Sequence, residues 1–237
     1  MYLLYYISAI LVLPAIIYSV YVSKKVNSTF QEYSRVGTSL GMSAAEVARM
    51  VLDKNGLTDV QVGHTNGNLT DHYDPRTNNV YLSDTVHNSY SVAAIGVAIH
   101  ECGHAMQAQE QYIPYKMRAS VFPLAKIGSQ LAIPLLLVGI LFDSFFYVGG
   151  ETTLGYIIMI AALVLYSFST LFTFITLPVE FNASKRAKNI LSEMINQDEI
   201  EGCEKVLDAA AKTYVASFAV SLMQLLRLLF LVMSRKK

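Results

Sequence analysis

Four apolar runs constrain the fold of this chain more than any other feature, because each is close to the length that crosses a lipid bilayer. A transmembrane helix needs about 20 mostly apolar residues, and the runs are Met1–Val22, Val121–Phe142, Leu154–Val179 and Tyr214–Met233. Only 15% of the residues are charged, against about 25% in an average soluble domain. The sequence therefore predicts a mainly α-helical membrane protein with one modest polar domain.

Basic residues predict the orientation of these helices. Met1–Val22 has no charged leader and no cleavage site, so we interpret it as a retained anchor, and Lys24 and Lys25 follow it. The link from Asp143 to Thr153 contains no Lys or Arg, whereas both flanks of the hairpin that it joins are basic. Since Lys and Arg concentrate on the cytoplasmic side, the polar segments are expected to face the cytoplasm.

The last apolar run allows two interpretations. Arg227 lies inside it and the chain closes with the basic residues Arg235, Lys236 and Lys237. The run either spans the membrane or lies along its inner surface with Arg227 reaching toward water. The expected organisation is a transmembrane anchor at 1–22, a cytoplasmic segment with the histidines at 23–120, a transmembrane hairpin at 121–179, cytoplasmic helices at 180–212 and a hydrophobic helix, spanning or interfacial, at 213–237.

The polar segment has the pattern of a small α+β domain. Ser43 and Glu46 form a capping box before a helix predicted over Ala44–Lys54, which Asn55-Gly56 ends. Asp59–Val62 and Val80–Leu82 are predicted as short strands of a hairpin-like sheet. Zero net charge and the absence of a basic run argue against a nucleic-acid partner.

His100, Glu101 and His104 form the HExxH pattern in a segment whose periodicity predicts a helix starting after Ser91. Residues four apart on a helix lie one turn apart on the same face, so both imidazoles can bind one metal ion. Glu101 lies beside that face, where it can take a proton from a metal-bound water. Cys102 is out of phase with both histidines and is interpreted as a packing residue.

A catalytic zinc takes three protein ligands and keeps one position open, so a third ligand is needed. Glu180 is our choice, because it is a carboxylate at the start of a helix on the same side of the membrane. The alternative without a metal is a glutamate that is favoured at a helix start by the helix dipole. Asp198 and Glu199, in a charged helix predicted from Glu193 to Lys205, are the other candidates for the third ligand. Ser184, one turn after Glu180, is placed to contact a ligand.

The segment Leu69–Arg76, which reads LTDHYDPR, is open to two interpretations. One is a surface turn held by Asx-type hydrogen bonds. The other is an edge of the active site, in which His72, Tyr73 or Arg76 donates a hydrogen bond to an oxyanion.

Several motifs together resemble the bacterial membrane-bound neutral zinc metallopeptidases of the YugP type. The resemblance rests on LTDHYDPR at 69–76, SVAAI at 91–95, HECGHAMQ at 100–107 and PVEFNASKRA at 178–187. It implies a gluzincin-like site with one Zn²⁺ per chain, held by His100, His104 and Glu180, and Glu101 as general base. It also implies a zincin-like domain and a bacterial cytoplasmic membrane. A more distant similarity runs to the heat-shock-type membrane metallopeptidases, in which an aspartate stands where this chain has Ser184.

The expected function is a zinc endopeptidase that hydrolyses protein or peptide substrates at the cytoplasmic face of the membrane. An extended substrate could be held by strand addition along Val80–Leu82 or a neighbouring strand. Two alternatives remain: an intramembrane protease of the site-2 type, and a non-catalytic membrane regulator with a structural zinc. The apolar run before His100, Val92–Ile99, is too short to span, which disfavours the first alternative.

Overall fold

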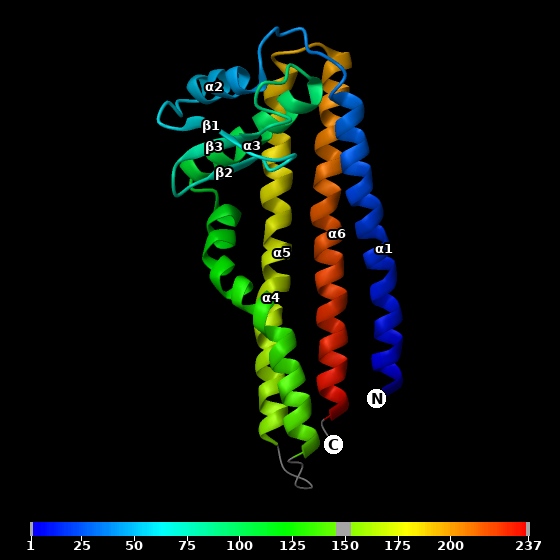
Figure 1. Cartoon of the computed structure of the whole chain (residues 1–237). Helices are drawn as coiled ribbons and strands as arrows, with labels where there is room; N and C mark the ends of the chain where they lie inside the picture. Colours follow the sequence, from blue (N-terminus) through cyan, green and yellow to red (C-terminus); the bar gives the residue numbers. More distant parts are fainter. Residues whose placement is uncertain (1, 146–152, 236–237) are drawn as a thin grey trace. The chain divides into compact units, whose positions relative to one another are not determined.

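The computed structural model describes residues 2–145 and 153–235, without the side chains of residues 2–9 and 11. Within them the chain is mainly helical, with one small sheet (Figure 1), which confirms the mainly α-helical part of the expected class. The elements in chain order are α1 Tyr2–Tyr33, α2 Ala44–Lys54, β1 Gln61–Thr65, β2 His72–Asp74, β3 Asn79–Ser83, α3 Val92–Gln109, α4 Ile113–Phe145, α5 Leu154–Ser192 and α6 Gln197–Arg235.

Among the described residues, three helices are long and apolar enough to cross a membrane, namely α4, α5 and α6. The predicted anchor Met1–Val22 belongs to α1, but its first residues fall largely outside the described side chains, so the anchor stays a prediction. The link between α4 and α5 likewise lies mostly outside the described residues.

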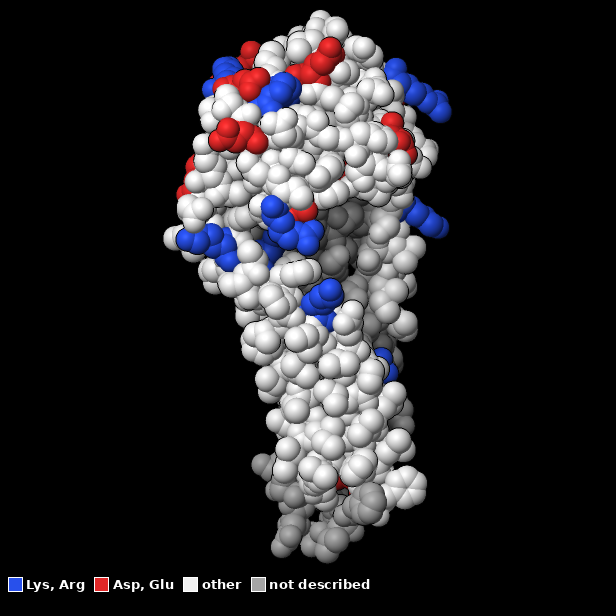
Figure 2. Space-filling view, turned by 60° about the vertical axis from the view of Figure 1, so that its left-hand side comes forward, with Lys and Arg blue, Asp and Glu red and all other residues white. Residues whose placement is uncertain are grey.

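The chain divides into two compact units. The apolar unit comprises Met1–Tyr21, Met117–Thr176 and Tyr214–Lys237, and the polar unit comprises Val22–Lys116 and Leu177–Thr213. The apolar unit holds only eight of the 36 Lys, Arg, Asp and Glu residues of the chain. Figure 2 shows a long stretch of surface that is almost free of these charged side chains, as expected for helices surrounded by lipid.

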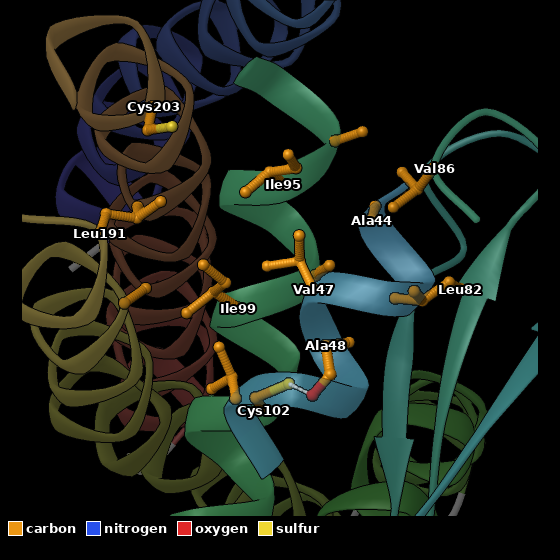
Figure 3. Packing of buried hydrophobic residues seen from close by; sticks show 14 of the residues in the cluster. Ala44, Val47, Ala48, Leu82, Val86, Ile95, Ile99, Cys102, Leu191 and Cys203 are labelled. Atoms are coloured by element: carbon orange, nitrogen blue, oxygen red, sulfur yellow. Dashed lines mark hydrogen bonds between the residues drawn. The ribbon is translucent and has the colours of Figure 1, made fainter. Parts of the chain in front are cut away.

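The core of the polar unit lies between α2, α3, the sheet and parts of α5 and α6 (Figure 3). The capping box at Ser43 and Glu46 starts α2, and Gly56, at φ +74°, follows its end, as predicted. The apolar stripe of α2 is buried, and its residues Val47, Ala48 and Val51 pack in the same cluster as Ile95 and Ile99 of α3. Burial of these side chains holds α3, and with it the two histidines, in the middle of the unit.

The sheet corrects two predictions. Its order is β1-β3-β2, with β1 parallel and β2 antiparallel to β3, so it is not a simple hairpin. The first strand runs over Gln61–Thr65 rather than Asp59–Val62. The strand predicted at Val80–Leu82 is β3, the central strand, and its Val80 and Leu82 side chains are fully buried.

Helices α4, α5 and α6 run along one another in the apolar unit. Leu136 of α4, Met159 of α5 and Val232 of α6 belong to one buried cluster. Thr170 of α5 lies 2.9 Å, Oγ1 to Oγ, from Ser221 near the middle of the apolar part of α6. The end of α6 therefore lies near the start of α5, and α6 runs antiparallel to α5.

Candidate metal centre

Helix α3 positions the first two candidate ligands. Its N-cap is Ser91, whose Oγ accepts a hydrogen bond from the backbone N–H of Ala94, as the sequence predicted. His100 and His104 lie one turn apart on this helix, with ring centroids 4.8 Å apart. Both side chains are largely buried, so their nitrogens face the interior of the polar unit rather than bulk water.

Helix α5 approaches α3 closely at Gly103. A Cβ added to Gly103 would lie 3.0 Å from the backbone oxygen and 3.2 Å from the Cα of Ala183. The missing side chain therefore allows two helix backbones to come together. Glu180 lies one turn before Ala183 on α5, so this crossing brings its carboxylate to the two histidines.

The three side chains converge on a single point. Glu180 Oε2 lies 3.3 Å from His100 Nε2 and 3.5 Å from His104 Nε2. Two ligands that share a tetrahedral zinc at about 2.0–2.1 Å are themselves about 3.4 Å apart. Two imidazole nitrogens and one carboxylate oxygen are also the donor set of many catalytic zinc sites, so these residues fit a zinc ion.

The electrostatics of Glu180 agree with this role. Its side chain is only 4% exposed, and burial by itself raises the pKa of the carboxyl. Hydrogen bonds from His100 and His104 outweigh burial, and the pKa of Glu180 lies well below its usual range. The carboxylate is therefore ionised at neutral pH and offers a negative ligand to a cation.

Glu101 lies at the edge of the same group. Its carboxylate and the nitrogens of His100 and His104 lie within 4.8 Å of one another, but Glu180 is closer to both imidazoles. The backbone N–H of Tyr73 donates to Glu101 Oε2 at 3.1 Å, so part of this carboxylate is held by β2. Burial raises the pKa of Glu101 to about 7. The arrangement suits a proton acceptor beside the metal better than a fourth ligand.

Comparison with known proteins agrees with this geometry. The model of a protein family described as "Putative neutral zinc metallopeptidase" matches residues 8–233. The chain belongs to this family. It is 46% identical over 212 residues to the protein named "Putative membrane protease YugP" from Bacillus subtilis (strain 168), covering 89% of each chain. No solved structure matches. Membership confirms the resemblance drawn from the motifs and zinc as the expected metal.

In this chain, the second ring nitrogen of each histidine, Nδ1, also has a partner. Ser184 Oγ lies 3.2 Å from His100 Nδ1, as its position one turn after Glu180 predicted. Gln107 Oε1 lies 3.0 Å from His104 Nδ1. Sequence reasoning missed Gln107, although its place three residues after His104 puts it on the same helix face.

The other candidate ligands lie elsewhere in the polar unit. Cys102 is fully buried, with Sγ 3.7 Å from the backbone oxygen of Ala48 in α2 (Figure 3), which agrees with a packing role. Glu199 accepts hydrogen bonds from the N–H and Oγ of Ser39. The charged helix predicted over 193–205 is not continuous, because α5 ends at Ser192 and α6 begins at Gln197.

The position of Glu180 within its helix also differs from the prediction. Pro178 lies inside α5, so Glu180 is in the interior of a continuous helix and not at a helix start. A helix in a membrane protein continues through a proline when packing and neighbouring groups compensate for the lost hydrogen bond. The dipole at a helix N-terminus therefore does not account for this glutamate.

The segment 69–76 contains a short strand at the sheet edge, β2, and is therefore more than a turn. The Tyr73 hydroxyl donates to Asn78 Oδ1, and Arg76 pairs with Asp74. His72 stacks on Tyr81, with ring centroids 5.2 Å apart. The contact of this segment with Glu101 is made by the backbone, through the Tyr73 N–H, which the residue types alone did not predict.

Proposed function

We propose that this chain is a membrane-bound endopeptidase in which His100, His104 and Glu180 hold one zinc and Glu101 is the general base. One observation carries the proposal: the Nε2 atoms of both histidines converge on Glu180 Oε2, at 3.3 and 3.5 Å, with the Glu101 carboxylate beside them. The family contributes the metal and the peptidase class.

The chemistry follows from the donor set and from Glu101. A zinc ion held by His100, His104 and Glu180 would lower the pKa of a water and polarise a carbonyl. Glu101 takes the proton of the attacking water and passes it to the leaving amine. The Tyr73 N–H keeps one oxygen of Glu101 in place. A pKa of about 7, which burial produces, suits a group that accepts and returns a proton near neutral pH.

Strand β2 is the best candidate for holding the substrate. Val80–Leu82 belongs to β3, which is paired on both sides, so a peptide cannot add to it. β2 is paired with β3 on one side only, and the Tyr73 N–H on its other side reaches Glu101. An extended peptide placed along this edge passes the general base.

We place the polar unit on the cytoplasmic side of a bacterial membrane. The reason is the basic residues that flank the α4–α5 hairpin on that side, since Lys and Arg concentrate in the cytoplasm. In this orientation α6 also crosses, because it runs along α5 to the end of the apolar unit. Arg235 Nη1 lies 3.6 Å from Asp143 Oδ2 there, and this ion pair reduces the free-energy cost of placing the basic C-terminal end of α6 on the outer side of the membrane. Labelling of a C-terminal tag in intact cells tests this topology, and protection of the tag would contradict it.

The two alternatives are disfavoured by separate observations. For intramembrane proteolysis the metal helix must itself lie in the membrane, but α3 belongs to the polar unit and is not one of the candidate spans found among the described residues. A structural zinc site usually has four protein ligands. Here Cys102 faces α2 instead, and Glu101 is held by β2.

The decisive experiment compares two variants of the purified full-length protein. Glu101→Gln is expected to retain zinc at wild-type stoichiometry and to lose casein hydrolysis, because the base is removed and the ligands remain. Glu180→Ala is expected to lose zinc, whereas Glu199→Gln, on a residue bonded to Ser39, is the matched control and retains both properties. Full activity in Glu101→Gln, or full zinc content in Glu180→Ala, would contradict the proposal.

A further inference from the structure

Gln107 is a polar side chain that the proposed chemistry does not use and yet is completely buried. Its amide bridges the two helices of the site. Oε1 lies 3.0 Å from His104 Nδ1, and Nε2 donates to the Val179 backbone oxygen at 2.8 Å and to Asn182 Oδ1 at 2.9 Å. A buried amide with all of these partners is costly to replace, so the arrangement calls for an explanation.

The direction of these hydrogen bonds can be deduced from the surface inward. Arg186 can only donate, and its Nε donates to Asn182 Oδ1 at 2.8 Å. Its guanidinium also forms a two-fold pair with Glu110 at 2.6 and 2.7 Å, which joins α5 to the end of α3. Asn182 Oδ1 is therefore an acceptor toward Gln107, as the Val179 oxygen must be.

Two acceptors on one side require that the Gln107 NH₂ group faces them, so Oε1 faces His104. An oxygen at that position accepts, and therefore His104 Nδ1 carries the proton. With Nδ1 protonated, Nε2 is the atom that can offer a lone pair to a metal, and it is the atom that faces Glu180 at 3.5 Å. The hydroxyl of Ser184 beside His100 Nδ1 can donate or accept, so it does not impose a tautomer in this way.

We propose that Gln107 is a positioning residue that holds His104 in the tautomer and orientation required for zinc, with Asn182 and Arg186 fixing the direction of its amide. The inference rests on the proposed function, in which His104 is a zinc ligand. A group that hydrogen-bonds the ring nitrogen of a ligating histidine that does not bind the metal typically contributes about 10- to 100-fold to metal affinity. Gln107 contributes on that scale.

The test compares Gln107→Met and Gln107→Glu for two properties of the full-length protein: zinc affinity, by competition with a chromophoric chelator, and thermal stability without metal. Methionine keeps the size of the side chain and removes the acceptor, so zinc affinity falls about 10- to 100-fold. Glutamate keeps an acceptor for His104 Nδ1, so zinc affinity stays within about threefold of wild type or rises. Glutamate also turns an oxygen toward the Val179 and Asn182 oxygens, so it is the less stable variant.

If Gln107 only packed against or bridged the helices, Gln107→Glu would be worse than Gln107→Met in both zinc affinity and thermal stability. Wild-type zinc affinity in Gln107→Met, or weaker affinity in Gln107→Glu than in Gln107→Met, overturns the proposal. Gln109→Met, on an exposed glutamine of the same helix, is the control for the substitution. His104→Ala separates the two hypotheses: retention of zinc in that variant refutes the ligand assignment itself, whereas its loss together with an unaffected Gln107→Met refutes only the role of Gln107.

Discussion

The crossing of α3 and α5 at Gly103 makes a quantitative prediction about the substitution Gly103→Ala. The new Cβ would lie 3.0 Å from the Ala183 oxygen and 3.2 Å from its Cα. Restoring an ordinary contact of about 3.5 Å requires that the two backbones separate by about 0.5 Å. That distance is the usual tolerance of a functional site, and the movement carries Glu180 away from His100 and His104.

Two opposing effects set the stability of this variant. Alanine stabilises a helix by about 1 kcal/mol relative to glycine, whereas overpacking of a core costs about 1–3 kcal/mol. The expected net change is a loss of up to about 2 kcal/mol in the free energy of unfolding of the metal-free protein. For a chain of this size such a loss lowers Tm by up to about 8 °C. Zinc affinity is expected to fall tenfold or more.

Gly96→Ala in the same helix is the matched control. Its Cβ would lie 3.5 Å from the Cβ and 3.6 Å from the Cα of Cys203, which are ordinary contacts. This variant is expected to gain up to about 1 kcal/mol from helix propensity and to bind zinc as the wild type does. Thermal unfolding by circular dichroism and chelator competition measure both quantities. The reasoning is refuted if Gly103→Ala matches Gly96→Ala in stability and in zinc affinity.

Two further predictions concern the active-site edge and the general base. If the His72 imidazole donates to the oxyanion, His72→Gln is expected to lower kcat about 100-fold with little change in KM. The control Arg76→Gln, on a side chain paired with Asp74, should leave casein hydrolysis near wild type. Equal rates in the two variants would exclude His72 as the oxyanion donor. Burial raises the pKa of Glu101 from 4.5 to about 7, so the folded, metal-free chain binds this proton more tightly than the unfolded chain. Its contribution to stability therefore falls as pH rises from 4.5 to 7, by at most about 3 kcal/mol. The stability of Glu101→Gln relative to wild type should rise over this range, as thermal unfolding at several pH values can show, and a constant difference would contradict it.

Several details of the fold could not be read from local patterns. The strand β2 lies inside a segment rich in turn-forming residues, shortly after Leu69 at φ +53°, and its three residues are too few to show an alternating pattern. The parallel pairing of β1 with β3 depends on contacts between distant residues, and short strands do not encode their partners. Pro178 suggested a helix boundary, but the continuous packing of α5 overrides this local preference.

The sequence by itself determined the local parts of the site and the membrane character of the chain. The four-residue spacing of His100 and His104 places both on one helix face, and long apolar runs have few alternatives to membrane helices. Only the tertiary structure decided how Glu180, far along the chain, meets them and how Gln107 is oriented. Both depend on the close approach of Gly103 to Ala183, because the distance between two helix axes is set by the side chains of both helices together and is not encoded in the pattern of either helix alone.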